Sequence, residues 1–357
     1  MSSFPFVTVM IPMRNEAATI SACVDSVLAQ DYPADRFEVL VVDGDSADDS
    51  VRVVEGYAQR TTCARVLRNP QRIVPTALNI AIRAARGDVI MRVDGHTHIA
   101  PDYMRIGVET LQRTNADNVG GPMISAGGGV IGEAIALATA SRFGIGAYFH
   151  FGTEEAEVDT VYLGMYPRSV FERVGLFDEE MVRNQDDEFN YRLRKAGGRI
   201  VLSPRMRSTY QNRQSLKALA KQYVQYGVWK VRVLQKHPRQ MSWRHFVPPT
   251  FVLALALAAV FAPWVRGAAL LALLTAGLYG AAVSVVAARL ARAAGGWLWL
   301  PLVAAFATLH VSWGGGFVAG LLWFAPRWFA ADAPPPQLAP PTGDVRNLGW
   351  SQPAAET

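Results

Sequence analysis

The stretch Val41-Val42-Asp43-Gly44-Asp45-Ser46 carries the pattern that decides the fold, an apolar run that ends at a carboxylate. The pattern recurs at Met91-Arg92-Val93-Asp94-Gly95-His96. A third acidic site follows at Asn184-Gln185-Asp186-Asp187-Glu188. In an open α/β sheet, the ligand lies outside the carboxyl ends of the parallel strands. Three acidic sites in this order therefore predict one pocket at one edge of a parallel sheet.

Strand-like and helical segments alternate along the first half of the chain. Apolar runs predict strands at 6–12, 37–42, 65–67, 88–93, 119–124 and 158–166. Apolar residues at helical spacing predict helices over 17–30, 48–59, 76–86, 100–114 and 188–196. This alternation is typical of a parallel sheet, so we expect an α/β domain over 1–210. The segment from Gly127-Gly128-Gly129 shows no clear pattern, and it fits a flexible loop before a helix better than a phosphate cradle.

Charge is distributed unevenly, so the net charge of +5 averages over two unlike halves. No Asp or Glu occurs between Glu188 and Asp332, whereas residues 192–244 contain fourteen Lys and Arg. A basic segment before apolar spans fits the cytoplasmic face of a membrane, where each cation gains about 1 kcal/mol from anionic lipid. The apolar spans disfavour nucleic acid as the partner. Cys23 and Cys63 form no disulfide or metal pattern, and no secretory signal precedes the first strand.

Three apolar stretches, 247–265, 268–291 and 297–325, are each about 19 residues or longer and lack Asp, Glu and Lys. Each is long enough to cross ~30 Å of hydrocarbon. The bias of cations predicts that the N-terminal domain lies on the cytoplasmic side of the inner membrane. We therefore expect interfacial helices over 211–246, three transmembrane helices over 247–326, and a disordered tail over 327–357 on the opposite face. A re-entrant third segment, made possible by Gly314-Gly315-Gly316, is the alternative.

The site at Asp94 and His96 has the residue types of a metal centre. Asp94 can bind a metal directly through a hard oxygen atom or hydrogen-bond to a metal-bound water, and His96 can bind the metal through its imidazole. A divalent metal held there would neutralise the diphosphate of a nucleotide-sugar donor as its glycosidic bond breaks. This mixed set suits Mn²⁺ better than an all-oxygen set would, with Mg²⁺ as the other candidate. His98 is the alternative ligand, and a polar loop without metal also fits.

Two further segments are candidates for holding the donor nucleotide. Pro12, Asn15 and Glu16 lie where the first strand gives way to a helix, whose N-terminus offers free N–H groups. Asn15 and Glu16 also suit a purely structural role as helix caps. Asp43 can accept a hydrogen bond from a uracil N3–H or a ribose hydroxyl. An Asx-turn around Gly44 is the alternative for Asp43.

The third acidic site opens a helix, where negative charge is also favoured by the helix dipole. One of its acids can serve as the general base that deprotonates an acceptor hydroxyl. Residue chemistry alone leaves Asp186, Asp187 and Glu188 open for that role. Gln222, Gln225 and Lys230 lie on a later amphipathic helix, whose aromatic residues suit a membrane interface. The same helix can instead close the donor site, with Lys230 meeting a phosphate.

Taken together, residues 5–235 resemble the family-2 glycosyltransferases, inverting enzymes of the GT-A fold. Residues 11–16 resemble the Pro-x-x-Asn-Glu element of the family, and 41–48 its Val-Asp-Asp-Gly-Ser-x-Asp element. Asp94-Gly95-His96 stands at the Asp-x-Asp position, with histidine in place of the last aspartate. Gln185-Asp186 stands at the Glu-Asp position, which implies that Asp186 is the base. Gln222-x-x-Gln225-Tyr226 is similar to a weakened Gln-x-x-Arg-Trp element of membrane polysaccharide synthases.

The Asp-x-His site, with 158–161, Gly164 and 183–186, further resembles the succinoglycan-type exopolysaccharide glucosyltransferases. That resemblance implies UDP-glucose as donor and a polyprenyl-diphosphate-linked saccharide as acceptor, at a lipid membrane. A polyprenyl-phosphate glycosyl synthase is the second enzyme hypothesis, and three spans disfavour a processive synthase. A tethered scaffold without catalysis stays open because Gln185 and His96 depart from the family pattern. The sugar, the acceptor and the linkage stay undetermined.

Overall fold

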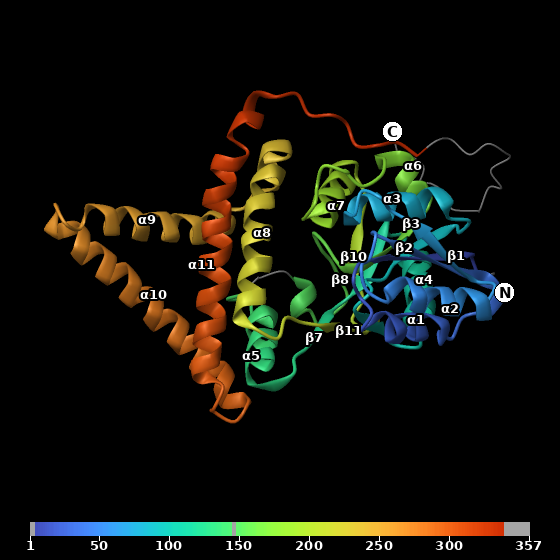
Figure 1. Cartoon of the computed structure of the whole chain (residues 1–357), viewed down its shortest axis with the longest axis horizontal. Coiled ribbons are helices and arrows are strands. Elements are labelled where there is room, and N and C mark those ends of the chain that lie inside the picture. Colours follow the sequence, from blue (N-terminus) through green and yellow to red (C-terminus); the bar gives the residue numbers. More distant parts are fainter. Residues whose placement is uncertain (1–3, 145–147, 339–357) are drawn as a thin grey trace.

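The computed structural model describes residues 4–144 and 148–338. An α/β domain lies on one side and long apolar helices on the other (Figure 1). The main sheet has eight strands in the order β3-β2-β1-β4-β9-β6-β10-β8. Their bounds are β1 Val7–Met13, β2 Phe37–Asp43, β3 Ala64–Arg68, β4 Val89–Arg92, β6 Asn118–Gly121, β8 Ala156–Glu157, β9 Tyr162–Pro167 and β10 Ile200–Leu202. The pairings β3-β2, β2-β1, β1-β4 and β6-β10 are parallel, which confirms the expected α/β fold.

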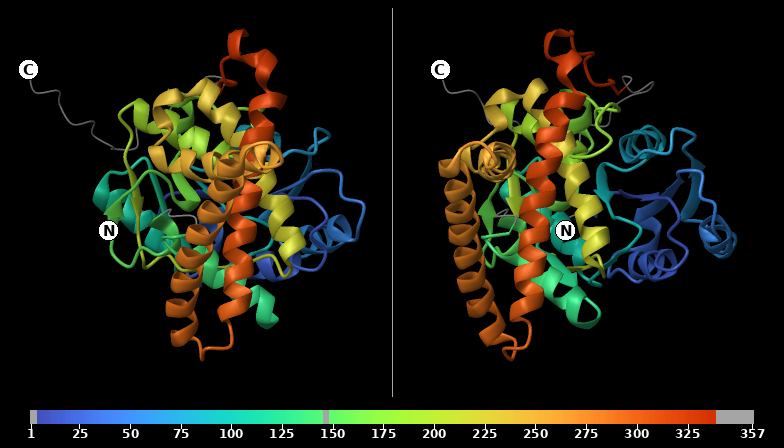
Figure 2. Two further views of the ribbon diagram at one scale, coloured as in Figure 1. Left: turned by 90° about the vertical axis from the view of Figure 1, so that its left-hand side faces the viewer. Right: turned by 60° about the vertical axis from the view of Figure 1, so that its left-hand side comes forward.

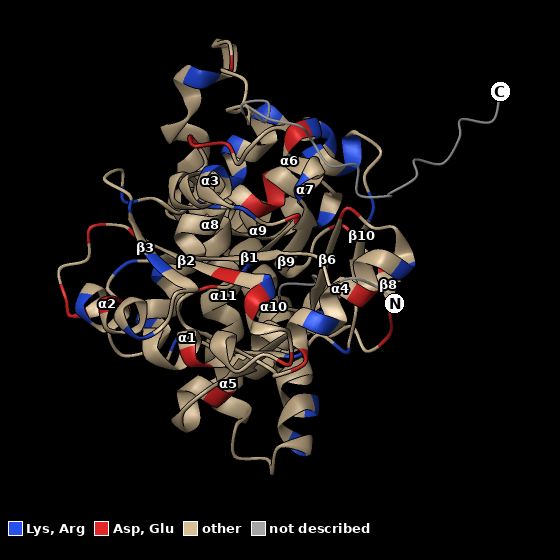
Figure 3. Ribbon diagram, turned by 90° about the vertical axis from the view of Figure 1, so that its right-hand side faces the viewer, with Lys and Arg blue, Asp and Glu red and all other residues tan. Residues whose placement is uncertain are grey.

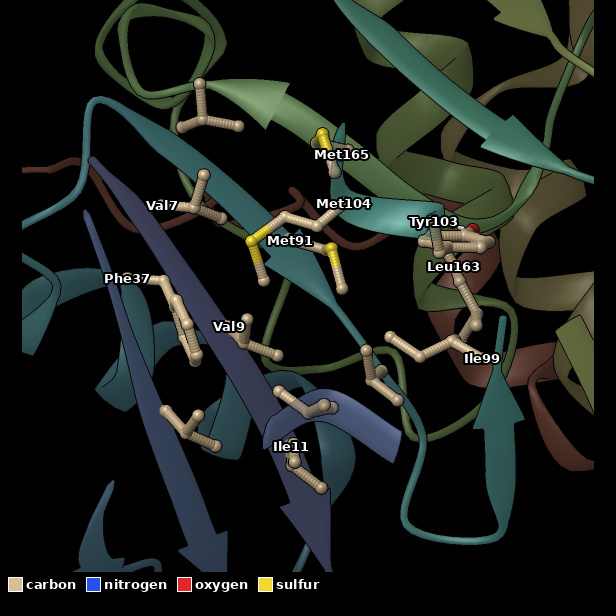
Figure 4. Close-up of a cluster of buried hydrophobic side chains, with 14 of the residues drawn as sticks. Val7, Val9, Ile11, Phe37, Met91, Ile99, Tyr103, Met104, Leu163 and Met165 are labelled. Carbon is tan, nitrogen blue, oxygen red and sulfur yellow. Dashed lines mark hydrogen bonds between the residues drawn. The ribbon is translucent and has the colours of Figure 1, made fainter. Parts of the chain in front are cut away.

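Helices cover both faces of this sheet, with bounds α1 Ile20–Leu28, α2 Ser50–Arg60, α3 Val74–Ala84, α4 Tyr103–Thr114, α6 Ser169–Val174 and α7 Gln185–Lys195. The two faces follow from the alternation of side chains along each strand. In β1, Val9 and Ile11 pack with α1, α2 and α4, whereas Met10 packs with α3, α6 and α7. Figure 4 shows part of the first cluster, where Val9 lies near Met91 and Ile11 lies further along the same strand. Short turns of 3-10 helix, η1 Ala34–Arg36 and η2 Tyr148–His150, complete the domain.

The expected strand over 119–124 is two strands in different sheets. β6 stays in the main sheet, whereas β7 (Met123–Ala126) joins a three-stranded sheet with β5 (Thr97–Ile99) and β11 (Ser208–Gln211). Pro122 lies between them and has no backbone N–H to donate to a ladder. The strand expected at 158–166 begins only at Tyr162, and it runs antiparallel between β4 and β6.

The glycine cluster leads directly into a helix, α5 (Gly129–Ala140), in keeping with the expectation that it precedes a helix. Ala134, Ile135 and Ala138 on α5 pack against Leu302 and Phe306 of the last long helix. The sequence showed no pattern there because its small apolar residues lie all around α5, with no polar face to set a period.

The C-terminal part consists of four long helices, α8 Leu216–Lys236, α9 Val247–Phe261, α10 Arg266–Ala293 and α11 Trp299–Trp323, with 3-10 turns η3 Pro238–Gln240, η4 Trp243–Phe246 and η5 Ala325–Phe329. Three segments are long and apolar enough to cross a membrane: Trp243–Phe261, Arg266–Ala293 and Trp299–Trp323. In Figures 1 and 2, α9 projects away from the α/β domain, α10 returns, and α11 lies beside α8. Charged residues of both signs lie on helices of the α/β domain such as α2 and α7 (Figure 3).

Glycines bring the backbones of α8 and α11 into close contact. A Cβ added to Gly227 on α8 would lie 2.2 Å from the carbonyl oxygen of Trp313. On α11, a Cβ on Gly316 would lie 2.3 Å from the carbonyl oxygen of Val224, and one on Gly320 2.7 Å from that of Val228. Small residues at such contacts let two helices approach closely. We call this contact the glycine seam.

The chain beyond α11 returns to the α/β domain (Figure 1). Arg327 forms an ion pair with Glu180, and the backbone N–H of Leu176 donates to the carbonyl oxygen of Pro336 at 2.8 Å. Leu338 packs against the α3, α6 and α7 cluster. The disorder expected over 327–357 is therefore wrong for residues 327–338, whereas residues 339–357 lie outside the described part of the chain.

Candidate active site

One cavity of about 1900 Å³ lies between the carboxyl ends of β1 and β4, the start of α7, and helices α8 and α11. The predicted site residues in its lining are Pro12, Glu16, Asp94, His96, Asp186, Gln222 and Lys230. Its far end is lined by residues of the apolar helices, among them Pro248, Leu309 and Trp313. The fold thus brings the polar motifs and the apolar C-terminal helices to a single space.

Arg92, at the end of β4, connects the two acidic sites. Its Nε donates to Asp94 Oδ1 at 2.8 Å, and its guanidinium lies 3.9 Å from Asp186 Oδ2. Burial lowers the pKa of Arg92, but the Asp94 and Asp186 carboxylates raise that pKa by more, so the net shift is upward. A permanent positive charge therefore lies between the candidate metal ligand and the candidate base.

The three acids that open α7 differ in their surroundings. Asp187 is held by the ammonium of Lys230. Glu188 is buried, and its carboxylate contacts Arg192 at 2.8 Å and His237 at 3.0 Å. Burial would raise the pKa of Glu188, but hydrogen bonds from His237 and Arg192 outweigh it and lower that pKa to about 2. Glu188 is thus a structural anion.

Asp186 has a different electrostatic setting: it faces the cavity, which leaves about half of its side-chain surface accessible, although the carboxyl group is surrounded by protein. Its Oδ1 accepts a hydrogen bond from the backbone N–H of Asp187 at 2.9 Å. Burial of the carboxyl group raises the pKa of Asp186, Arg92 opposes that shift, and the Asp187 carboxylate adds to it. A carboxylate with a raised pKa binds a proton more readily, which suits a general base.

His96 is oriented by Glu16, whose Oε1 lies 3.1 Å from His96 Nδ1. Among residues 4–144 and 148–338, no group of three or more His, Cys, Asp and Glu is arranged to hold a metal. Asp94 and His96 both line the cavity, however, and divalent ions in such sites take further oxygens from substrate phosphates. A carboxylate and an imidazole therefore fit a metal shared with a bound nucleotide. His98, the alternative ligand, is exposed on β5 and does not line the cavity.

Asn15 and Asp43 bind the two neighbouring loops together and do not line the cavity. The backbone N–H of Ala47 donates to Asn15 Oδ1 at 2.8 Å, and the Asn15 backbone N–H donates to Ser46 Oγ at 2.9 Å. Asp43 accepts from the Ser46 hydroxyl at 2.6 Å and from its backbone N–H. Asp43 thus accepts hydrogen bonds within its own loop, as in the turn around Gly44 that was the alternative to nucleotide binding by this residue.

The α8 residues fall into two groups. Gln222 lines the cavity, and its Nε2 donates to the hydroxyl of Tyr226 at 2.9 Å. Lys230 also lines the cavity while it pairs with Asp187. Gln225 does not line it and instead accepts from Arg183 Nε at 3.1 Å.

Several arginines in the lining did not figure among the candidate residues, and Arg92, Arg239 and Arg244 are three of them. Arg92 interrupts the apolar run before Asp94. A charged residue inside a buried strand is unusual, and this feature of the sequence could have identified Arg92 as a site residue. Arg239 and Arg244 are exposed in the connection between α8 and α9, and they belong to the basic segment that the composition had already marked.

Comparisons with known proteins agree with this geometry. Residues 8–175 match the model of glycosyl transferase family 2. The succinoglycan biosynthesis protein ExoA of Rhizobium meliloti is 29% identical over 332 residues, which cover 89% of this chain and 96% of that protein. A dolichyl N-acetyl-α-D-glucosaminyl phosphate 3-β-D-2,3-diacetamido-2,3-dideoxy-β-D-glucuronosyltransferase of Methanococcus voltae is 28% identical over 249 residues, covering 67% of this chain and 77% of that protein.

A solved structure shares the fold. The mannosyltransferase PcManGT of Pyrobaculum calidifontis, in complex with GDP-Man and Mn²⁺, superimposes with a TM-score of 0.54 and 23% identity. The match covers 85% of this chain and 86% of that one. The chain therefore carries a glycosyl transferase family 2 domain of the GT-A fold, and it is a glycosyltransferase of glycan synthesis.

Proposed function

We propose that the enzyme transfers a sugar, with inversion, from a UDP-sugar to a lipid-linked saccharide at a membrane. The observation that carries this proposal is the single cavity, whose lining runs from Asp94 and Asp186 to the apolar helices around Trp313. A water-soluble donor fits the first end, and an acceptor carried on a lipid fits the second. Of the two relatives, one is a succinoglycan biosynthesis protein and one acts on a dolichyl-linked phosphate. UDP-glucose and a polyprenyl-diphosphate carrier are the specific donor and acceptor that we propose.

Asp186 is the proposed base. It takes the proton of the acceptor hydroxyl as that oxygen attacks the anomeric carbon of the donor. The bond from the anomeric carbon to the diphosphate oxygen breaks, and UDP leaves with the bonding electron pair. A single displacement of this kind inverts the anomeric centre. Asp186 is favoured as the base by its raised pKa and by its position in the cavity. The neighbouring acids are already paired, Asp187 with Lys230 and Glu188 with Arg192.

Asp94 and His96 would hold the divalent metal, Mn²⁺ or Mg²⁺. When bound, the metal would supply the positive charge that stabilises the departing diphosphate. Arg92 donates a 2.8 Å hydrogen bond to Asp94 Oδ1 and so restrains the orientation of that carboxylate. Glu16 orients the His96 ring in the same way. These contacts position the ligands before the donor binds.

The remaining site residues are proposed to hold the donor. Pro12 and Glu16 line the cavity and would meet the nucleoside, and Gln222 and Lys230 would meet the phosphates. Asn15, Asp43 and Gln225 would have to exchange their present partners to reach it. We propose that the catalytic domain lies on the cytoplasmic side of the inner membrane, where nucleotide sugars are made and where the basic segment of the chain is favoured.

The test is transfer of labelled sugar from a panel of nucleotide sugars into the lipid extract of membranes that contain the enzyme. Asp186→Asn should bind UDP normally and transfer sugar at least ~100-fold more slowly, the range expected for loss of a general base. Asp35→Asn, on an exposed residue far from the cavity, is the matched control and should transfer at the normal rate. Normal turnover of Asp186→Asn would refute its role as base. A labelled product without a diphosphate link would instead identify a polyprenyl-phosphate glycosyl synthase.

A further inference from the structure

The end of the described chain is attached to the catalytic domain, and this limits how the helices can cross a membrane. Arg327 pairs with Glu180, and Asp332 pairs with the buried guanidinium of Arg232. The carbonyl oxygen of Pro336 accepts from the backbone N–H of Leu176 at 2.8 Å. Direct contacts of this kind cannot be made through ~30 Å of hydrocarbon. The segment after α11 must therefore lie on the same face of any membrane as the catalytic domain.

Helix α11 contacts the preceding part of the chain near its middle and at its C-terminal end. Near its middle, His310 Nε2 lies 2.9 Å from the carbonyl oxygen of Phe143, and Phe306 packs with α5. At its C-terminal end, the carbonyl oxygen of Phe324 accepts from Gln235 Nε2 of α8 at 2.8 Å. Between these points the glycine seam holds α11 against α8. α11 is therefore packed on protein along one whole side.

Helix α8 cannot itself lie in hydrocarbon, because its cations are joined to acids of the catalytic domain. Lys230 pairs with Asp187, Arg232 with Glu180, and Lys236 with Asp178. Charged side chains at the centre of a bilayer are costly. Because α11 lies along α8, the two helices share the same surroundings on that side.

Helices α9 and α10 differ from α11 in their packing. In Figures 1 and 2, α9 projects away from the catalytic domain and α10 returns toward α11, and many of their apolar side chains are exposed. The exposed apolar residues of the two helices and their connection include Leu257, Val260, Trp264, Leu273, Leu274 and Leu278. Apolar surface of this extent is typical of a membrane interaction site.

We propose that α9 and α10 enter the membrane as a hairpin and return, while α11 stays at the surface of the catalytic face. The chain between residues 246 and 325 then crosses the membrane an even number of times. Arg289 and Arg292, at the end of α10, would return to the same face as the basic segment before α9, as the positive-inside rule favours. This arrangement replaces the three-span model, which would place residues 327–338 on the opposite face from the domain that they contact.

The test compares the two faces with single cysteines in a Cys63→Ser background that retains the buried Cys23. Ala333→Cys reports the segment after α11, and Gln59→Cys, exposed on α2, reports the catalytic domain. We expect an impermeant maleimide to label neither cysteine in intact cells and both after permeabilisation. Labelling of Ala333→Cys in intact cells, with Gln59→Cys still protected, would overturn the proposal.

A second measurement does not depend on permeability. The double variant Glu180→Cys with Arg327→Cys replaces two side chains that contact each other. A short bis-maleimide should join these cysteines within one chain, so that most of their later labelling by a second maleimide is lost. The control pair Glu180→Cys with Trp264→Cys places one cysteine at the far tip of the hairpin and should keep its labelling. Equal labelling of both pairs would overturn the proposal, whatever the activity of the enzyme.

Discussion

Two adjacent glycines of α11 allow the glycine seam to be tested with a matched pair of substitutions. A Cβ on Gly316 would lie 2.3 Å from the carbonyl oxygen of Val224 and 2.9 Å from its Cα, whereas a Cβ on Gly315 meets no atom within 4 Å. Both positions lie inside the same helix. Gly316→Ala and Gly315→Ala therefore add the same methyl group, one into a backbone contact and one into open space.

The expected difference in stability follows from these distances. Contacts between carbon and a carbonyl oxygen settle at about 3.3–3.6 Å, so Gly316→Ala must move α11 away from α8 by roughly 1 Å. Overpacking of this kind costs about 1–3 kcal/mol. Both variants gain the same ~0.5–1 kcal/mol from replacing glycine in a helix, so that gain cancels in the comparison. Gly316→Ala should therefore unfold about 1–3 kcal/mol more easily than Gly315→Ala.

Thermal unfolding of the purified, detergent-solubilised protein measures this difference. Trp313 lies at the seam and Trp229 packs on Phe324, so tryptophan fluorescence reports the separation of α8 and α11. At roughly 2 °C per kcal/mol, the value for larger domains, the Tm of Gly316→Ala should lie about 2–6 °C below that of Gly315→Ala. Equal Tm values for the two variants would refute the close contact between the helices, and with it the placement of α11.

Three further predictions concern the site and its support. Burial raises the pKa of Asp186 and Arg92 opposes that shift, so activity should fall as the pH drops through this pKa. Arg92→Gln should raise the pKa further and move this fall to higher pH in a pH–rate profile. An unchanged profile would mean that Arg92 does not act on Asp186. Chelation of the divalent metal should abolish sugar transfer, and added Mn²⁺ should restore it. The variant His96→Ala should need a higher Mn²⁺ concentration for half-maximal rate. An unchanged Mn²⁺ requirement would exclude His96 as a ligand. Burial would raise the pKa of Glu180, but Arg232 and Lys236 lower it to about 2. Because that pKa lies below its ordinary ~4.3, Glu180 should stabilise the fold above about pH 5 and lose this effect toward pH 2, and Glu180→Gln should flatten that part of a curve of Tm against pH.

The α/β core could be predicted because its strands follow a local rule. Successive residues of a strand point to opposite faces, so Val9 and Ile11 enter one cluster while Met10 enters the other. Each apolar run of this kind is visible in the sequence without knowledge of its partners. The position of Asp94 follows from a second rule, that ligands bind outside the carboxyl ends of parallel strands, because Asp94 comes just after β4. Asp186 lines the same cavity.

The remaining features depend on contacts between distant segments. β9 pairs with β4 and β6 in the antiparallel direction, and no residue of β9 alone indicates that choice. Hydropathy cannot distinguish a helix that faces lipid from one that faces protein. α11 is as apolar as a membrane span, yet Leu302, Phe306 and Phe317 on it are buried against the rest of the chain. The contacts of the segment after α11 with Glu180 and Leu176 likewise depend on the three-dimensional structure.

Helix α8 links the candidate base to the apolar helices. At the start of α7, Arg183 donates to Gln225, and Asn184 Nδ2 donates to the carbonyl oxygen of Tyr226 at 3.2 Å. Asp187, on the other side of Asp186, is held by Lys230. The backbone that carries Asp186 is thus fixed on both sides by α8, whose opposite side forms the glycine seam.

This connection has a consequence for where the catalytic unit ends. A boundary at residue 210 would remove α8 and with it the partners of Arg183, Asn184 and Asp187. The raised pKa of Asp186 depends on burial and on the nearby charges of Arg92 and Asp187. Removing Lys230 would leave the Asp187 carboxylate without its ion pair. That carboxylate lies next to Asp186 and already raises the pKa of Asp186. The α/β domain therefore requires α8 to hold the proposed base in place, and α8 in turn packs on α11. On this reasoning α11 supports the proposed active site as well as the proposed membrane attachment.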